Sequence, residues 1–133
     1  MAKPTPKPLG IFICDTVIDD RATSKKSLIG LFNSIHATTV PCRHQELHVF
    51  IALTDGYGQY KSRIICHHRD TGVAVFEAEG EIRFDDPNQV VELNFGLHGL
   101  VFKEFRVHDF DFYRDDQHSV ARKFTVNQAA GSS

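Results

Sequence analysis

Apolar and polar residues alternate with a period of two through most of the chain, and this pattern constrains the fold more than any other feature. Successive side chains of a strand point to opposite faces, so the alternation predicts strands with one buried face. The sustained 3.6-residue apolar stripe of an amphipathic helix is missing. The clearest example is residues 47–54, where every second position is apolar: Leu47, Val49, Ile51 and Leu53.

Turn-forming residues divide the alternating segments from one another, as at Asp55-Gly56 and His98-Gly99. Short strands separated by turns at a spacing of about 8–12 residues indicate a sandwich or a barrel. We therefore expect an all-β fold, an antiparallel β-sandwich of about eight strands. The expected strands are residues 9–18, 27–38, 47–54, 60–69, 73–84, 89–97, 103–113 and 119–126.

A chain of 133 residues fits one domain and needs no metal or cofactor to fold. We expect residues 1–8, which are rich in proline, to form a flexible N-terminal arm. Residues 9–126 form the sandwich domain, and residues 127–133 form a flexible tail.

Charge and cysteine content limit the classes of partner and the compartment. The net charge is -2 without clustered Lys and Arg, which argues against nucleic acid. The first apolar run is too short for a membrane span or a signal sequence. Cys14, Cys42 and Cys66 are odd in number and widely spaced, which predicts reduced thiols and a cytoplasmic protein. Cys14 and Cys66 lie among isoleucines and are expected to be inert.

Four segments together resemble a bacterial family of small proteins of unassigned function that is similar to immunoglobulin-like sandwiches. The resemblance covers about residues 9–126 and implies an immunoglobulin-like fold. It carries no catalytic residue to this chain. The segments are Leu9–Asp15, Ser27–Phe32, Val107–Tyr113 and Phe124–Val126.

Eight histidines raise the question of a metal site or a catalytic base. The densest groups are Cys42-Arg43-His44 with His48, and Cys66-His67-His68. Neither group has the second close pair of ligands that is typical of zinc sites. His67 and His68 are neighbours in an expected strand, so they point to opposite faces and cannot share one ion. The chain also lacks the G-x-S-x-G, H-E-x-x-H and phosphate-loop motifs. We expect a protein that is not an enzyme, with a small metal-dependent hydrolase as the second alternative.

Aspartates gather in the expected turns, and alternate turns of an antiparallel sandwich lie at the same end. Seven carboxylates there could bind Ca²⁺, which prefers oxygen ligands from flexible loops, or a small ligand. Aspartate is also a favoured turn residue, which explains the pattern without any ligand. A Ca²⁺- or ligand-binding sandwich is therefore the first alternative. Its candidate residues are Asp19, Asp20, Asp55, Asp85, Asp86, Asp115 and Asp116.

A binding or assembly module is the function that the sequence favours. Such a module presents loops or an edge strand to another protein or to its own copy, which would make it a homo-oligomer. The expected strand 60–69 has apolar residues on both faces and supplies the interface candidates Tyr60, Ile64 and Ile65.

The phase of the expected strand 103–113 decides which of its side chains enter the core. Phe110 and Phe112 should point inward and pack with Phe76, Phe95 and Phe124. Asp111, between the two phenylalanines, should point outward into solvent.

Overall fold

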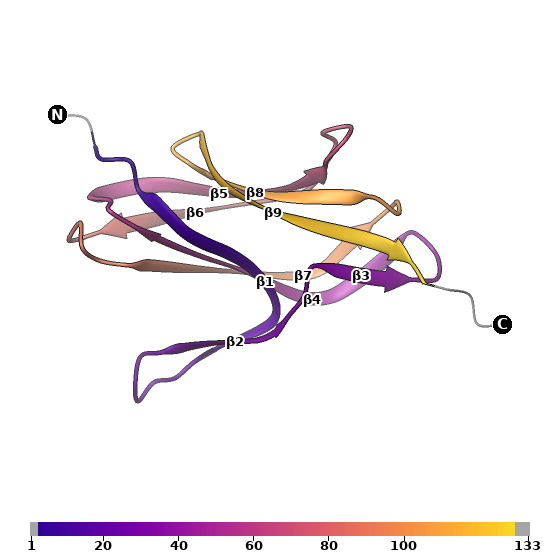
Figure 1. Cartoon of the computed structure of the whole chain (residues 1–133), viewed down its shortest axis with the longest axis horizontal. Helices are drawn as coiled ribbons and strands as arrows, with labels where there is room; N and C mark the ends of the chain where they lie inside the picture. Colours follow the sequence, from indigo (N-terminus) through magenta and orange to yellow (C-terminus); the bar gives the residue numbers. More distant parts are fainter. Residues whose placement is uncertain (1–2, 130–133) are drawn as a thin grey trace.

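Nine β-strands and no helix make up the computed structural model of the chain, which describes residues 3–129 (Figure 1). No helix that could cross a membrane occurs in that range. The strands are β1 (Lys7–Asp19), β2 (Lys26–Leu31), β3 (Ser34–Ala37), β4 (Cys42–Thr54), β5 (Gly58–His68), β6 (Ala74–Phe84), β7 (Val91–Phe102), β8 (Val107–Arg114) and β9 (Gln117–Gln128).

The strands form two sheets. Sheet A has four strands in the order β2-β1-β4-β7, and sheet B has five in the order β3-β9-β8-β5-β6. Neighbouring strands run antiparallel except β3 and β9, which pair in parallel. Apolar side chains from both sheets form one core between them. The all-β prediction and its two layers are therefore confirmed.

The expected strand 27–38 is wrong as a single strand, because it divides into β2 in sheet A and β3 in sheet B. The chain crosses between the sheets at Phe32 and Asn33. The Phe32 amide donates to the Ile13 carbonyl of β1 at 3.1 Å, and the Asn33 carbonyl accepts from the Thr125 amide of β9 at 3.0 Å. Apolar alternation continues through this crossing, so the sequence pattern cannot mark the change of sheet.

Two other strands are longer than expected. β4 begins at Cys42 rather than at residue 47, and β7 continues to Phe102 through Gly99, whose φ is 68°. The polar residues at both places indicated loops in the sequence. Arg43, Gln45, Glu46 and His98 are indeed exposed. His44, however, packs against Phe32, and Leu100 and Phe102 of the same segments lie in the core.

The described part of the N-terminal segment contacts the sandwich. The Tyr60 hydroxyl donates to the Pro4 carbonyl at 2.7 Å, and Lys3 Nζ lies 2.9 Å from Asp115 Oδ2. β1 begins at Lys7 and β9 ends at Gln128, so the strands extend slightly beyond residues 9–126. Most of the expected tail, residues 130–133, lies outside the described residues.

The phenylalanine core is confirmed at three of its positions. Phe110, Phe112 and Phe124 are fully buried between the sheets. Phe76 and Phe95 are only partly buried, and they pack against the margin of the core.

Asp111 differs from its prediction. It lies on the outer face of sheet B, as its position between Phe110 and Phe112 requires, but it is buried. His67 of β5 and His118 of β9 cover its carboxylate. A strand pattern predicts which face a side chain occupies, and it cannot predict what neighbouring strands place over it.

Candidate interaction surface

The second half of β1 and the whole of β2 form a two-stranded hairpin that projects from the sandwich. β1 pairs with β4 only from Lys7 to Cys14, and from Thr16 to Asp19 its partner is β2 alone. Figure 1 shows β2 and its turn lying away from sheet B. The turn is closed by its own hydrogen bonds, because Asp20 N donates to Lys25 O at 2.9 Å.

Gly30 lets the two strands of the hairpin lie close together. Its φ is 72°, a left-handed conformation that side chains disfavour. A Cβ atom at Gly30 would also collide with the carboxylate of Asp15 on the neighbouring strand. The sequence of the hairpin is therefore matched to its geometry at this position.

Three large apolar side chains are exposed on one face of the hairpin. The exposed fractions are 49% for Ile18, 46% for Ile29 and 59% for Leu31. They share a face because Ile29 lies opposite Thr16 and Leu31 lies opposite Cys14 in the β1–β2 register. We call Ile18, Ile29 and Leu31 the hairpin surface. Grouped apolar side chains of this kind mark interaction sites.

β2 also has an unpaired edge, because it is the outermost strand of sheet A. Natural proteins protect such edges with short strands or with charged side chains. β3 has only four residues, and the exposed face of β6 carries Glu77, Glu79 and Glu81. β2 has one charged residue, Lys26, at its start. β7, the opposite edge of sheet A, also carries a single acidic residue, Glu92, but it lies beside β6 of sheet B. β2 is therefore an edge strand that can accept another strand.

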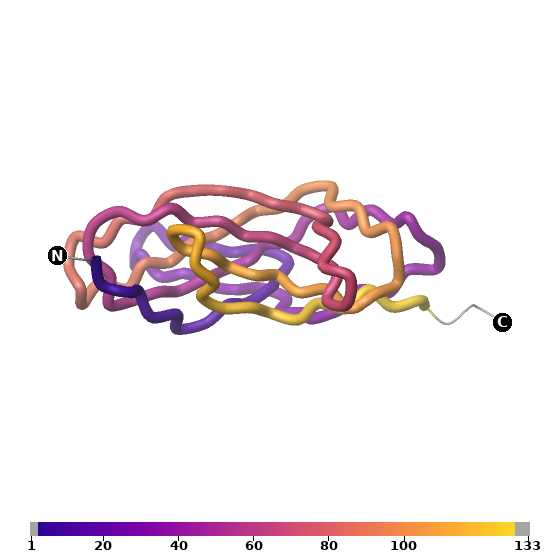
Figure 2. The backbone as a smooth tube through the Cα atoms, turned by 90° about the horizontal axis from the view of Figure 1, so that it is seen from above, coloured from indigo at the N-terminus to yellow at the C-terminus, as the bar shows by residue number. Residues whose placement is uncertain are grey.

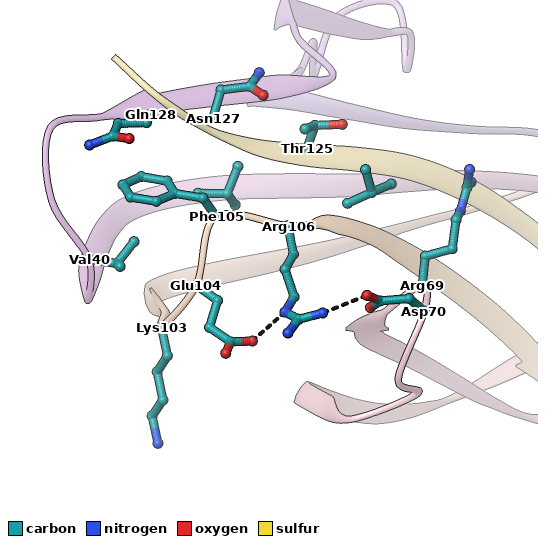
Figure 3. A pocket seen from close by; sticks show the side chains of 12 residues that line it. Val40, Arg69, Asp70, Lys103, Glu104, Phe105, Arg106, Thr125, Asn127 and Gln128 are labelled. Carbon is teal, nitrogen blue, oxygen red and sulfur yellow. Dashed lines mark hydrogen bonds and ion pairs between the residues drawn. The ribbon is translucent and has the colours of Figure 1, made fainter. Parts of the chain in front are cut away.

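A groove of about 800 Å³ lies between the 103–106 turn and the end of β9 (Figure 3). Arg106 crosses this groove and donates to Glu104 Oε2 and to Asp70 Oδ2, each at 2.5 Å. Arg69 on its wall is paired with Asp109 at 2.6 Å. The guanidinium groups of the groove are thus already neutralised by carboxylates of the same chain.

Two buried histidines, His68 and His108, lie on the core side of β5 and β8, with ring centroids 5.0 Å apart. His108 Nδ1 lies 3.0 Å from the Arg106 carbonyl, and its buried Nε2 has no hydrogen-bond partner. Burial lowers the pKa of His108 below its ordinary value. We conclude that His108 is a neutral core residue at pH 7.

On the outer face of the same strands, Asp111 lies between two imidazoles. His118 Nε2 donates to Asp111 Oδ1 at 2.6 Å, and His67 Nε2 contacts Asp111 Oδ2. His67 Nδ1 faces the His68 carbonyl at 3.1 Å. Both nitrogens of His67 therefore face acceptors, an arrangement that the doubly protonated ring satisfies.

The pKa of His67 agrees with this protonation state. Burial alone would lower the pKa, but the hydrogen bonds to Asp111 and to the His68 carbonyl outweigh burial and raise it. The network is an ion pair that links β5, β8 and β9, and both carboxylate oxygens of Asp111 have imidazole partners.

The sequence as a whole matches one known family. The matching family model is described as "Family of unknown function (DUF6941)", and it covers residues 9–127. The chain belongs to this family. A search of curated proteins finds no match.

In this DUF6941 protein the turn aspartates make local contacts. Most strands run along the long axis of the molecule (Figure 2). Asp20 and Asp86 accept from turn amides, Asp115 accepts from the Lys61 amide, and Asp85 pairs with Arg83. Asp19 lies 3.6 Å from Lys26, and Asp116 lies 4.0 Å from Arg63. Asp55 occupies a turn position with φ of 65°.

Among residues 3–129, no three His, Cys, Asp or Glu side chains are arranged to hold an ion.

The structure corrects the interface expected on β5. This strand is paired on both sides, with β8 and with β6, so it is not an edge. Tyr60 and Ile64 are buried in the core, and Ile65 is half-buried on the outer face of sheet B. The adjacent Ile64 and Ile65 indicated an interface in the sequence, whereas Ile64 belongs to the core.

The cysteines and the neighbouring histidines lie as predicted. Cys14, Cys42 and Cys66 are free, and burial raises the pKa of Cys66 to about 12. His68 points to the core while His67 points to the outer face.

The hairpin surface was missed by the sequence interpretation, which assigned Ile18 to one strand and Ile29 and Leu31 to another, both with buried apolar faces. One signal was present: Val17-Ile18 and Leu28-Ile29 are adjacent apolar pairs, which place apolar groups on both faces.

Proposed function

We propose that this DUF6941 protein is a binding and assembly module whose contact surface is the β1–β2 hairpin, and that two copies join along β2. The single observation that carries the proposal is the unpaired edge of β2 beside the hairpin surface of Ile18, Ile29 and Leu31. An edge strand gains affinity from backbone hydrogen bonds, and alternate side chains give specificity.

The sequence of β2 suits pairing with its own copy. In a two-fold antiparallel pair centred on Ile29, each Ser27 lies opposite the other copy's Leu31. Residues 27, 29 and 31 share the face of the hairpin surface, so both surfaces would merge into one apolar patch. Lys25 and Lys26 of the two copies would lie at opposite ends of the joint, where like charges stay apart.

The position of the hairpin also favours this joint. Because β2 and its turn project from the sandwich, another strand can reach the free edge without meeting sheet B (Figure 1). The result would be a continuous sheet that buries both unpaired edges.

The compartment and the finer fold class belong to the same proposal. Three free cysteines support a reducing, cytoplasmic location. The crossings of the chain between sheets A and B support an immunoglobulin-like sandwich.

Sedimentation velocity from micromolar to millimolar concentration tests the proposal. The wild-type chain should form a dimer, and Ile29→Lys with Leu31→Lys should be monomeric because four charges would enter the joint. Val90→Lys, which changes another exposed apolar residue outside the hairpin, is the matched control and should dimerise. A monomeric wild type, or an equal loss in the control, would refute the proposal.

A further inference from the structure

Three side chains with metal-binding chemistry share the outer face of sheet A, on strands other than those of the hairpin surface. Glu46 and His48 are two residues apart on β4, and His98 of β7 lies directly opposite Glu46. Gly96 lies opposite His48 in the same register. Directly opposed residues and residues two apart point to the same face, so the three side chains are neighbours.

One oxygen of Glu46 lies near a nitrogen of each imidazole. Glu46 Oε1 is 3.5 Å from His48 Nε2 and 3.7 Å from His98 Nδ1. An N–H···O hydrogen bond measures about 2.7–3.2 Å. These contacts are longer than hydrogen bonds, unlike the 2.6 Å contact of His118 with Asp111. The two imidazoles therefore approach the carboxylate without being joined to it.

Asn94 fixes the orientation and the tautomer of His48. Its Oδ1 atom lies 3.0 Å from His48 Nδ1, and an amide oxygen can only accept, so Nδ1 carries the hydrogen. In the neutral ring the lone pair then lies on Nε2, which faces Glu46. Metal-binding histidines characteristically donate their other ring N–H to such a partner.

Gly96 leaves space between the two rings. A Cβ atom at this position would lie 3.1 Å from His48 Cε1 and 3.8 Å from His98 Nε2. A side chain here would press against both imidazoles, whereas glycine leaves the floor of the site open.

The site has one fixed donor and two adaptable donors. The side chain of His48 is 13% exposed, whereas those of Glu46 and His98 are 47% and 69% exposed. The three donors do not converge on one point as they stand, in keeping with the lack of a closed ligand set within residues 3–129. Rotation of the two exposed side chains about their own bonds can bring them toward His48 Nε2 without moving the backbone.

We propose that Glu46, His48 and His98 bind one divalent first-row transition-metal ion, with water completing its coordination. Two imidazoles and a carboxylate suit Zn²⁺, Ni²⁺ and Cu²⁺, whereas Ca²⁺ and Mg²⁺ prefer sets made of oxygen ligands alone. In the other group of two imidazoles and a carboxylate, both rings already contact the carboxylate of Asp111 directly, through His67 Nε2 and His118 Nε2.

Calorimetric titration of the untagged chain with Ni²⁺ and Zn²⁺ tests the site. One equivalent of metal should bind, with no binding of Ca²⁺ or Mg²⁺. His98→Ala and Glu46→Gln should abolish stoichiometric binding, and Asn94→Ala should weaken it by about tenfold or more because His48 loses its orienting partner. His36→Ala, an exposed histidine on β3, is the matched control and should bind as the wild type does.

Electron paramagnetic resonance of the Cu²⁺-loaded chain gives a second readout, because two imidazole ligands produce nitrogen hyperfine splitting that His98→Ala should reduce. The altered residues lie on the surface, and unchanged melting without metal would show that the variants fold. The proposal is overturned if no metal binds at one equivalent, if His98→Ala and Glu46→Gln bind like the wild type, or if His36→Ala loses binding equally.

Discussion

At the scale of single residues, the protein places ionisable groups on both faces of β5 and β8. His108 lies in the core with an unpartnered Nε2, while Asp111 and His67 form an ion pair on the outer face. A neutral ring and a charged ring thus lie within one pair of strands. Both rings make the free energy of unfolding depend on pH, and the two dependences have opposite sign.

Replacing His108 by leucine should flatten the decline of stability in acid. The pKa of His108 is lowered in the folded protein, so as pH falls below about 6.5 the unfolded chain takes up a proton that the folded chain refuses. The free energy of unfolding therefore falls with pH until the lowered pKa is passed. His67 acts oppositely, because its raised pKa makes its contribution complete in acid and lost as pH rises through that pKa.

Urea unfolding of the wild type and of His108→Leu between pH 5 and about 7.5 measures the contribution of His108 to this pH dependence, since His67 is present in both proteins. The Arg106 carbonyl keeps a partner in the variant, because the Val126 amide also donates to it at 3.0 Å. An unchanged pH dependence in the variant would show that His108 is not the buried neutral group.

Asp111→Ala should be clearly destabilising, by about 1–3 kcal/mol, because it leaves the imidazolium of His67 without its carboxylate. This replaces the expectation that Asp111 points into solvent. Phe112→Ala should cost about 3–5 kcal/mol through the cavity that it leaves. Glu79→Ala, which removes an exposed carboxylate from strand β6, is the control, with an effect below about 0.5 kcal/mol. Urea melts in which Asp111→Ala and Glu79→Ala agree would contradict the buried ion pair.

At the scale of elements, the period-two alternation predicted the features that depend on the local sequence alone. The strand phase of β8 was correct, because alternation decides which side chains reach the core. The division of residues 27–38 into β2 and β3 was not predictable, because partner strands far along the chain determine it. For the same reason β5 resembled an edge strand and proved to be central.

The candidate surface was predictable only in kind. An edge strand as the contact element stays a prediction, and which strands are edges depends on the sheet order, which the sequence does not contain. Ile29 and Leu31 carry the same apolar character as core residues. They are exposed because they lie on the outer face of sheet A, where Leu31 is opposite Cys14 and Cys14 is opposite His48.

Gly30 tests the hairpin as an element, with Gly72 as a natural control. Both have positive φ, of 72° and 75°, but only Gly30 has a neighbour that a Cβ would strike. Gly72→Ala should cost about 1–2 kcal/mol from the backbone conformation alone. Gly30→Ala should cost more, because Asp15 must also move. Equal losses in thermal melts would show that Asp15 does not restrict the hairpin.

At the scale of the whole molecule, the two sheets divide their roles. The outer face of sheet B carries charged and ion-paired side chains. Its edge strand β6 carries glutamates, which disfavour the addition of another strand. Sheet A has the projecting hairpin at one edge and the Glu46–His48–His98 group on its outer face. The surfaces that we propose for a partner and for an ion are therefore both on sheet A.

The most direct measurement of the β2 joint is amide hydrogen exchange at increasing protein concentration. Exchange along the free edge is fast in a monomer and becomes slow when the amides pair across the joint. We expect β2 to gain protection between micromolar and millimolar concentration, while the edge strand β6 stays unchanged. Exchange in β2 that is independent of concentration, or protection that rises equally in β6, would contradict assembly through the hairpin.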